Sequence, residues 1–273
     1  MNRGLTWFNR VSLVLGFGFL YLPILLLIIF SFNESKLVTV WGGFSTKWYG
    51  ALLENQGLLD AAWVTFRVAF VSSTVATVLG LVAGLMLSRF GAFRGRVLFS
   101  GMIYAPLVMP EVITGLSLLL MFVAISFDRG FVTVTIAHIT FSMCYVAVVV
   151  QSRLISFDRS IEEAAMDLGC PPGRTFLLIT LPVIMPAIVS GWLLSFTLSL
   201  DDLVIASFTT GPGATTLPMK IYSQVRLGVT PEINAVSTIL VGVVAMGVLV
   251  ASVLAKRDEA RRAQDERLAA AAP

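Results

Sequence analysis

Acidic residues inside otherwise apolar stretches are the residues of this sequence most able to do chemistry. Glu111 follows Pro110 within one long apolar block, and Asp201 and Asp202 are adjacent in the segment SLDDL of another. A carboxylate at membrane depth costs about 3 kcal/mol on insertion scales, so it usually faces a cavity, a partner or a substrate. We predict that Glu111, Asp201 and Asp202 line the path of a cationic solute. The alternative is a structural role, in which the acids hold helices together.

The two aspartates cannot both point into the same path, because consecutive residues of a helix point about 100° apart. At most one of Asp201 and Asp202 points straight into a lumen. Three roles are open to the other: capping a helix, pairing with Arg67, or binding a neighbouring subunit.

The remaining reactive side chains indicate neither an enzyme nor a cofactor. His138 is the single histidine and lies in an apolar stretch, where a hydrogen-bonding or packing role is the favoured interpretation. Cys144 and Cys170 have no evident disulfide or metal partner, so we interpret both as structural. The pattern GxxxxGK[ST] of an ATP-binding loop is absent from the sequence. We predict that the chain binds no metal and hydrolyses no ATP itself.

The composition is that of a protein embedded in a membrane. Of the 273 residues 57% are hydrophobic and 13% charged, and the mean hydropathy is +0.89. A soluble domain carries about 25% charged residues. The net charge of +3 follows the arrangement of loops described below, so we expect lipid contacts and no nucleic-acid partner.

Six apolar stretches are long enough to cross a bilayer, which needs about 20 residues. The expected fold is therefore all-α and polytopic, with an uncleaved first span. The third block is too long for one straight crossing, and we expect Pro106 and Pro110 to bend or break it. The predicted spans are 11–32, 62–88, 97–126, 131–151, 183–208 and 233–255.

The basic residues predict the orientation of these spans. The N-terminus, the loop 89–96, the polar loop after the fourth span and the C-terminal tail carry 13 of the 19 lysines and arginines. By the positive-inside rule, both termini and that polar loop are cytoplasmic.

The polar loop at 158–182 carries the strongest local signals. Ser160 followed by Glu163 predicts a capping box, and Gly169 followed by Pro171 and Pro172 predicts the helix end. The enclosed helix has only about two turns and is marginal alone, so its apolar face needs a docking partner. That face consists of Ile161, Ala164, Ala165 and Leu168.

The spacing of this loop resembles the EAA loop of inner-membrane permeases in ATP-binding cassette (ABC) importers. In that family the loop forms the coupling helix, which sits in a cleft of the cytoplasmic ATPase. An ordinary amphipathic loop helix is the alternative interpretation. The matching anchors are Glu163, Ala164, Ala165, Gly169, Ile179, Leu181 and Pro182.

A more specific resemblance covers residues 11–255. The segments 105–120, 159–169, 181–208 and 211–218 are similar to the second permease subunit of bacterial polyamine importers, and 37–53 resembles the putrescine-type members. The resemblance implies a type I ABC importer permease fold in the inner membrane. It also implies a paired permease subunit, two ATPase subunits and a periplasmic polyamine-binding protein as partners.

The expected substrate is putrescine or spermidine, which suits acids on the path. A permease of the same fold for an amino acid or a metal complex is one alternative, and a passive channel is another. We expect three parts: 1–61 with the first span and outer loop, the core 62–255, and the charged tail 256–273. The outer loops 41–49 and 211–226 are the expected docking sites for the binding protein, and residues 230–232 are expected to begin the sixth helix.

Overall fold

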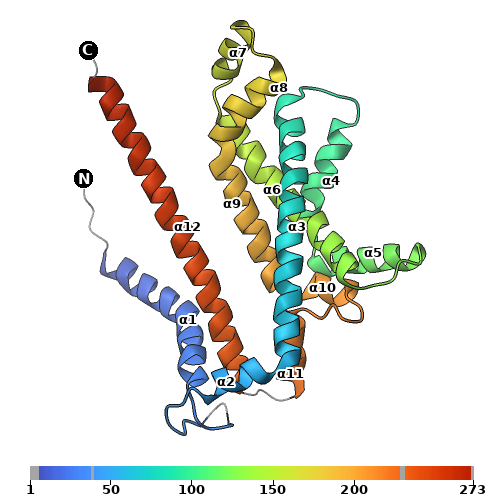
Figure 1. Cartoon of the computed structure of the whole chain (residues 1–273), viewed down its shortest axis with the longest axis vertical. Helices are drawn as coiled ribbons and strands as arrows, with labels where there is room; N and C mark the ends of the chain where they lie inside the picture. Colours follow the sequence, from blue (N-terminus) through green and yellow to red (C-terminus); the bar gives the residue numbers. More distant parts are fainter. Residues whose placement is uncertain (1–5, 38–39, 228–230, 272–273) are drawn as a thin grey trace. The chain divides into compact units, whose positions relative to one another are not determined.

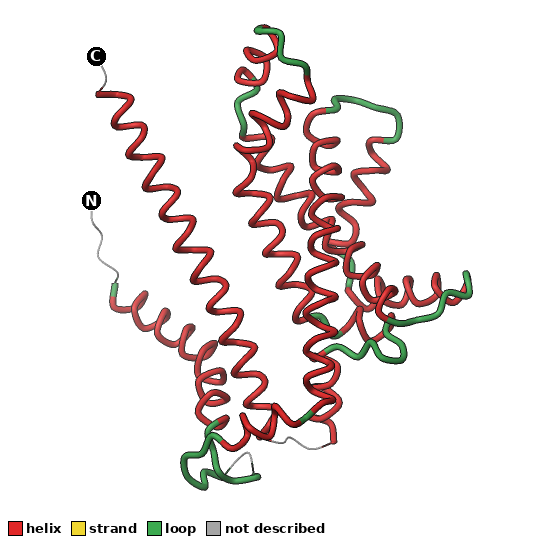
Figure 2. The backbone as a smooth tube through the Cα atoms, viewed as in Figure 1, coloured by secondary structure: helices red, strands yellow, loops and turns green. Residues whose placement is uncertain are grey.

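The computed structural model describes residues 6–37, 40–227 and 231–271, and these form helices joined by short loops (Figures 1 and 2). Within this part of the chain the only β pairing is an isolated bridge between Asn33 and Phe44. Five helices are long and apolar enough to cross a membrane, and a sharply bent helix pair makes a sixth span. The predicted all-α, six-span fold is confirmed.

The chain divides into two compact units, and each is described by itself. The first comprises Met1–Gln56 with Gln224–Pro273, and the second comprises Gly57–Ser223. The first unit holds α1 (Trp7–Ser31), α2 (Lys47–Glu54) and α12 (Pro231–Ala271). Both α1 and α2 pack against α12. Pro231 and Glu232 begin α12 as predicted, whereas Thr230 lies outside the described residues.

Asn33 organises the loop that follows α1. Its side-chain amide donates to Val40 O at 2.7 Å, and its side-chain oxygen accepts from Gly42 N at 2.8 Å. Its backbone oxygen accepts the indole N–H of Trp48 at 2.6 Å. Asn33 and Trp48 are buried, while Trp41 and Phe44 stay exposed. The loop therefore has a defined shape and presents aromatic side chains outward.

The second unit is a bundle organised around the contact of α6 with α3 and α9. Its helices up to the polar loop are α3 (Gln56–Arg89), α4 (Arg96–Val108), α5 (Glu111–Ala124) and α6 (Phe131–Ser156). The remainder are α7 (Ser160–Asp167), α8 (Pro172–Thr175), the π-helical segment η1 (Phe176–Thr180), α9 (Leu181–Asp201), α10 (Val204–Thr209) and α11 (Leu217–Leu227).

Small residues let these helices approach closely. A Cβ at Gly80 of α3 would come within 2.6 Å of Val146 in α6, and one at Gly84 within 2.9 Å of the Ala147 carbonyl. Gly191 brings α9 against the same valine. Val146, Val150 and Ile184 are fully buried at this junction. Close packing of this kind is what holds helices together where lipid replaces water.

Two spans of this unit are interrupted. α4 and α5 meet at an angle of 118° at Met109–Pro110, which confirms the predicted break (Figure 1). The fifth span, predicted to run to residue 208, instead stops at Asp201, and α10 begins at Val204. The reason is that Asp202 adopts an extended conformation and uses its side chain to cap α10. The helices that follow the two breaks, α5 and α10, pack on each other at Gly115 and Phe208.

Candidate functional site

The polar loop contains the predicted short helix, but its start is capped differently. Ser160 is the first residue of α7 and not its cap, so the predicted capping box is wrong. Asp158 takes the role instead, because its Oδ1 accepts the Ser160 N–H at 3.0 Å. The amide and hydroxyl of Ser160 hold the pKa of the Asp158 carboxyl below its usual value. Ser160 thus lies at the helix start and donates the hydrogen bond that Asp158 accepts.

The end of α7 is the one that the sequence predicts. Gly169 has a φ of +87°, in the left-handed region that glycine adopts without strain. Its N–H donates to Met166 O at 2.9 Å, and the N–H of Cys170 donates to Ala165 O at 3.0 Å. This pair of bonds is a Schellman motif, which satisfies the last carbonyls of the helix.

The apolar side of α7 stays uncovered by the part of the chain that the structure describes. None of its eight residues is buried. Ile161 is 48% exposed and Leu168, directly after the helix, is 90% exposed. In Figure 1, α7 and α8 lie at one end of the second unit, while α5 and α10 lie towards the other. An exposed apolar face on so short a helix is typical of a docking element.

The remaining anchors of the loop shape the start of the fifth span. Ile179 lies in η1, and Leu181 and Pro182 are the first two residues of α9. The Leu181 N–H bonds Phe176 O, five residues back, which defines the π-helical turn. Because Pro182 lacks an N–H and its ring would clash with the carbonyl four residues earlier, a wider turn is favoured here. The proline of the motif thus explains the local π geometry.

The predicted path acids all lie at helix breaks of the second unit. Glu111 is the first residue of α5, directly after the 118° bend, and it is exposed. Asp201 is the last residue of α9 and is also exposed. Asp202 follows it and is only 9% exposed. The chain interruption therefore turns the two neighbouring aspartates towards different surroundings.

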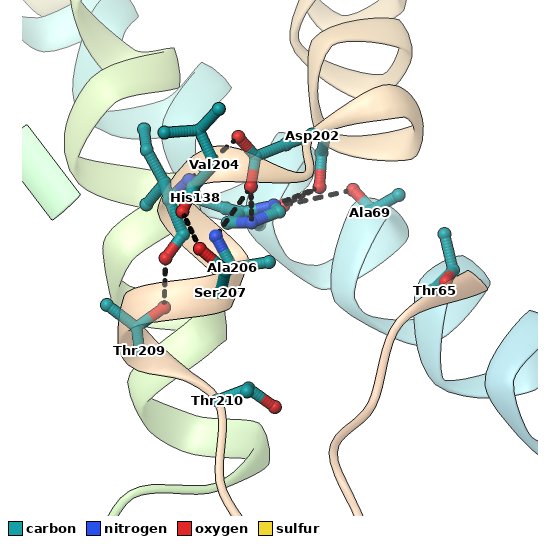
Figure 3. A network of polar contacts seen from close by, with 12 residues as sticks. Thr65, Ala69, His138, Asp202, Val204, Ala206, Ser207, Thr209 and Thr210 are labelled. Atoms are coloured by element: carbon teal, nitrogen blue, oxygen red, sulfur yellow. Dashed lines mark hydrogen bonds and ion pairs between the residues drawn. The ribbon is translucent and has the colours of Figure 1, made fainter. Parts of the chain in front are cut away.

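Asp202 is held by α10 and by the single histidine (Figure 3). Its Oδ1 accepts Ile205 N–H at 3.2 Å and its Oδ2 accepts Ala206 N–H at 2.7 Å, so it caps α10. His138 Nε2 lies 3.1 Å from the same Oδ2, without the alignment of a good hydrogen bond. Of the roles left open for the second aspartate, capping is the one observed. Arg67 lies over the ring of Phe131, 4.8 Å from its centroid.

The histidine extends this contact into the bundle. His138 is fully buried, and its Nδ1 lies 2.6 Å from Ser199 Oγ. Ser72 Oγ donates to the same hydroxyl at 3.2 Å. The network joins α3, α6, α9 and the break before α10 by side chains alone. The predicted hydrogen-bonding role of His138 is confirmed, but no sequence signal indicated which residues it would bond.

Sequence reasoning also missed Glu162, to which it assigned no role. Its Oε1 accepts from Thr180 Oγ1 at 2.6 Å and lies 3.2 Å from Arg89 Nη2. The three residues belong to the loop helix, the π segment and the end of the second span. No group of three His, Cys, Asp or Glu side chains in the described part of the chain is placed to hold a metal ion.

Comparison with solved structures gives the fold. The chain resembles the structure of a bacterial alginate ABC transporter in complex with an alginate pentasaccharide-bound periplasmic protein. The TM-score is 0.69 at 18% sequence identity, covering 91% of this chain and 92% of that one. The bundle with its exposed loop helix therefore has the fold of a membrane-spanning ABC importer subunit.

The sequence comparisons give the family. Residues 76–263 match the model of the binding-protein-dependent transport system inner membrane component, and the chain belongs to this family. It is 58% identical over 261 residues to the putrescine transport system permease protein PotI of Escherichia coli K12, covering 93% of each chain. It is 43% identical to the spermidine/putrescine transport system permease protein PotC of the same organism, covering 90% of this chain and 92% of that one. The chain is thus an inner-membrane transport subunit rather than an enzyme.

Proposed function

We propose that this chain is a permease subunit that passes a polyamine across the inner membrane, driven by ATP hydrolysis on partner subunits. The single observation that carries the substrate class is the high identity to a putrescine permease along nearly the whole chain. Putrescine is the first candidate substrate and spermidine the second. A cationic substrate also suits the placement of the acids at the helix breaks.

The helix that ends at a break contributes negative electrostatic potential in addition to that of the carboxylates. The last four carbonyls of a helix lack intrahelical partners, and the helix dipole places partial negative charge there. Asp201 ends α9, so its carboxylate adds to that end. Transporters commonly coordinate cations with the C-terminal ends of such discontinuous helices. A diamine that loses hydration needs compensation of this kind.

We assign different tasks to the three acids of the proposed path. Exposed Asp201 and exposed Glu111 meet the cation directly. Buried Asp202 fixes the break through α10 and His138 and thereby sets where α9 ends. The path therefore includes Asp202 as a positioning residue and the other two as contacting residues.

The coupling partner is a cytoplasmic ATPase at α7. The helix exposes its apolar face and is held in shape by the Asp158 cap and the Gly169 end. In the proposed assembly this chain pairs with a second permease subunit, and each permease docks one ATPase subunit. The excess of lysine and arginine in the loops on one side supports a cytoplasmic location of both termini and of α7.

The outer loops are the proposed docking sites for a periplasmic polyamine-binding protein. The loop 41–49 is held in shape by Asn33 and exposes Trp41 and Phe44. Aromatic side chains on a rigid loop provide contact area at low entropic cost. The segment 211–226 is the second docking element.

The test is reconstitution of the complete complex in lipid. ATPase activity and uptake are measured with binding protein loaded with putrescine, with spermidine or with arginine as a cationic amino acid. We expect polyamine-dependent stimulation and accumulation that disappear when the ATPase subunits carry an inactivating substitution. Uptake that persists without ATP hydrolysis would indicate a passive channel. Stimulation by arginine and not by polyamines would refute the substrate class.

A further inference from the structure

We propose that Glu162 is a positioning residue that passes movement of α7 to the inner ends of α3 and α9. This inference rests on the proposed coupling to an ATPase and names the side chain that performs it within this chain. It differs from the motif anchors, because Glu162 contacts the bundle and not the exposed docking face.

One carboxylate oxygen of Glu162 makes both contacts. Thr180 Oγ1 donates to Oε1 at 2.6 Å, and Arg89 Nη2 lies 3.2 Å from the same atom. The side chains of Glu162 and Arg89 are each only 14% exposed, and Thr180 is buried. A charge-assisted pair shielded from water is stronger and more directional than a solvated one. Movement of α7 therefore displaces an oxygen to which two other elements are bonded.

Arg89 also contacts an aromatic ring. Its guanidinium carbon lies 5.8 Å from the centroid of the Phe157 ring, at the end of α6. Arg89 is the last residue of α3, so the pair acts at the end of a helix 34 residues long. The arginine thus joins α7 to the ends of two membrane-spanning helices.

Thr180 brings the contact to the π-helical start of the fifth span. It is the last residue of η1, whose π-helical turn leads directly into α9. Single π turns inside helices are frequent at functional sites. At its other end α9 reaches Asp201 and the capped break. A displacement at Thr180 is therefore applied to the helix that carries a proposed path acid.

The test uses variants that separate charge, contact and folding. Glu162→Gln keeps the size and an acceptor for Thr180 but removes the charge that pairs with Arg89. Asp167→Asn is the matched control, because Asp167 is an exposed acid of the same helix without a motif role. The double variant Glu162→Arg with Arg89→Glu reverses the pair. Each is purified as the complete complex with its ATPase subunits.

The measured quantity is substrate transported per ATP hydrolysed at equal assembly. We expect Glu162→Gln to lower this ratio at least fivefold while the ATPase subunits still co-purify, and Asp167→Asn to leave it unchanged. The reversed pair should recover at least half of the loss. A residue that served only folding would lower assembly, transport and hydrolysis together and leave the ratio unchanged. A wild-type ratio in Glu162→Gln overturns the proposal.

A second measurement does not depend on transport. Hydrogen exchange of the backbone amides in 176–181 is compared in Glu162→Ala and Asp167→Asn. We expect at least tenfold faster exchange in Glu162→Ala alone, and equal exchange in both variants overturns the contact. If the wild-type complex shows no substrate-stimulated hydrolysis, the proposed function fails, and this exchange experiment still decides whether Glu162 links α7 to η1.

Discussion

Replacing Asp202 by asparagine tests whether Asp202 has a structural role while its neighbour Asp201 contacts the substrate. The carboxylate accepts two backbone bonds, from Ile205 and Ala206, and approaches His138 at 3.1 Å. Asparagine has one side-chain oxygen, so one of the two backbone bonds is lost, which costs about 1.5–3 kcal/mol for a charged acceptor. The charge beside His138 is lost as well. The backbone N–H that loses its acceptor is buried, which places the cost at the upper end of this range, and asparagine retains part of the contact with His138.

We therefore expect Asp202→Asn to destabilise the second unit by about 3 kcal/mol. For a domain of this size that corresponds to a fall in melting temperature of roughly 6–12 °C. The neighbouring variant Asp201→Asn removes the same charge from an exposed position, where substitutions change stability by about 0.5 kcal/mol or less. Its effect should appear in transport: a loss of about 1.4 kcal/mol of barrier stabilisation lowers the uptake rate tenfold.

The assay combines thermal unfolding of the purified complex in lipid with uptake measured per assembled complex. The expected pattern is a large stability loss for Asp202→Asn and a large uptake loss with normal stability for Asp201→Asn. His138→Ala should resemble the first variant, because it removes the other partner of the pair. If Asp202→Asn melts like wild type and abolishes uptake, Asp202 contacts the substrate and the assignment of tasks is wrong.

Four further variants test the rest of the assembly. Gly169→Val places a β-branched residue at a φ of +87°, which costs roughly 1–2 kcal/mol, and Ala165→Asp places a charge on α7. Both should insert normally but lose ATPase association in co-purification, and full transport by both would contradict the docking role. A cysteine at Ser45 should react with an impermeant thiol reagent from the periplasm, whereas Cys170 should not; the reverse pattern would overturn the orientation. Glu111→Gln should lower uptake by up to tenfold at normal expression, and unchanged uptake would remove Glu111 from the path.

The features that the sequence determined depend on residues that are close together in the chain. Gly169 ends α7 because glycine adopts positive φ without strain, and Pro110 interrupts the third span because proline cannot complete the helical bond. Apolar length predicts the spans because every backbone group in lipid must bond internally. These causes are local, so they can be recognised without coordinates.

The features that only the tertiary structure decided depend on residues far apart in the chain. The fifth span ends with α9 at Asp201, because Asp202 caps α10 and contacts His138, 64 positions earlier in α6. Glu162 accepts hydrogen bonds from Arg89, 73 positions earlier, and from Thr180. The cap of α7 is Asp158 and not the predicted Ser160. Both side chains suit that role, and the path of the loop selects one. Residue type shows that a polar group needs a partner, and only the packing of α3, α6 and α9 determines which partner lies within reach.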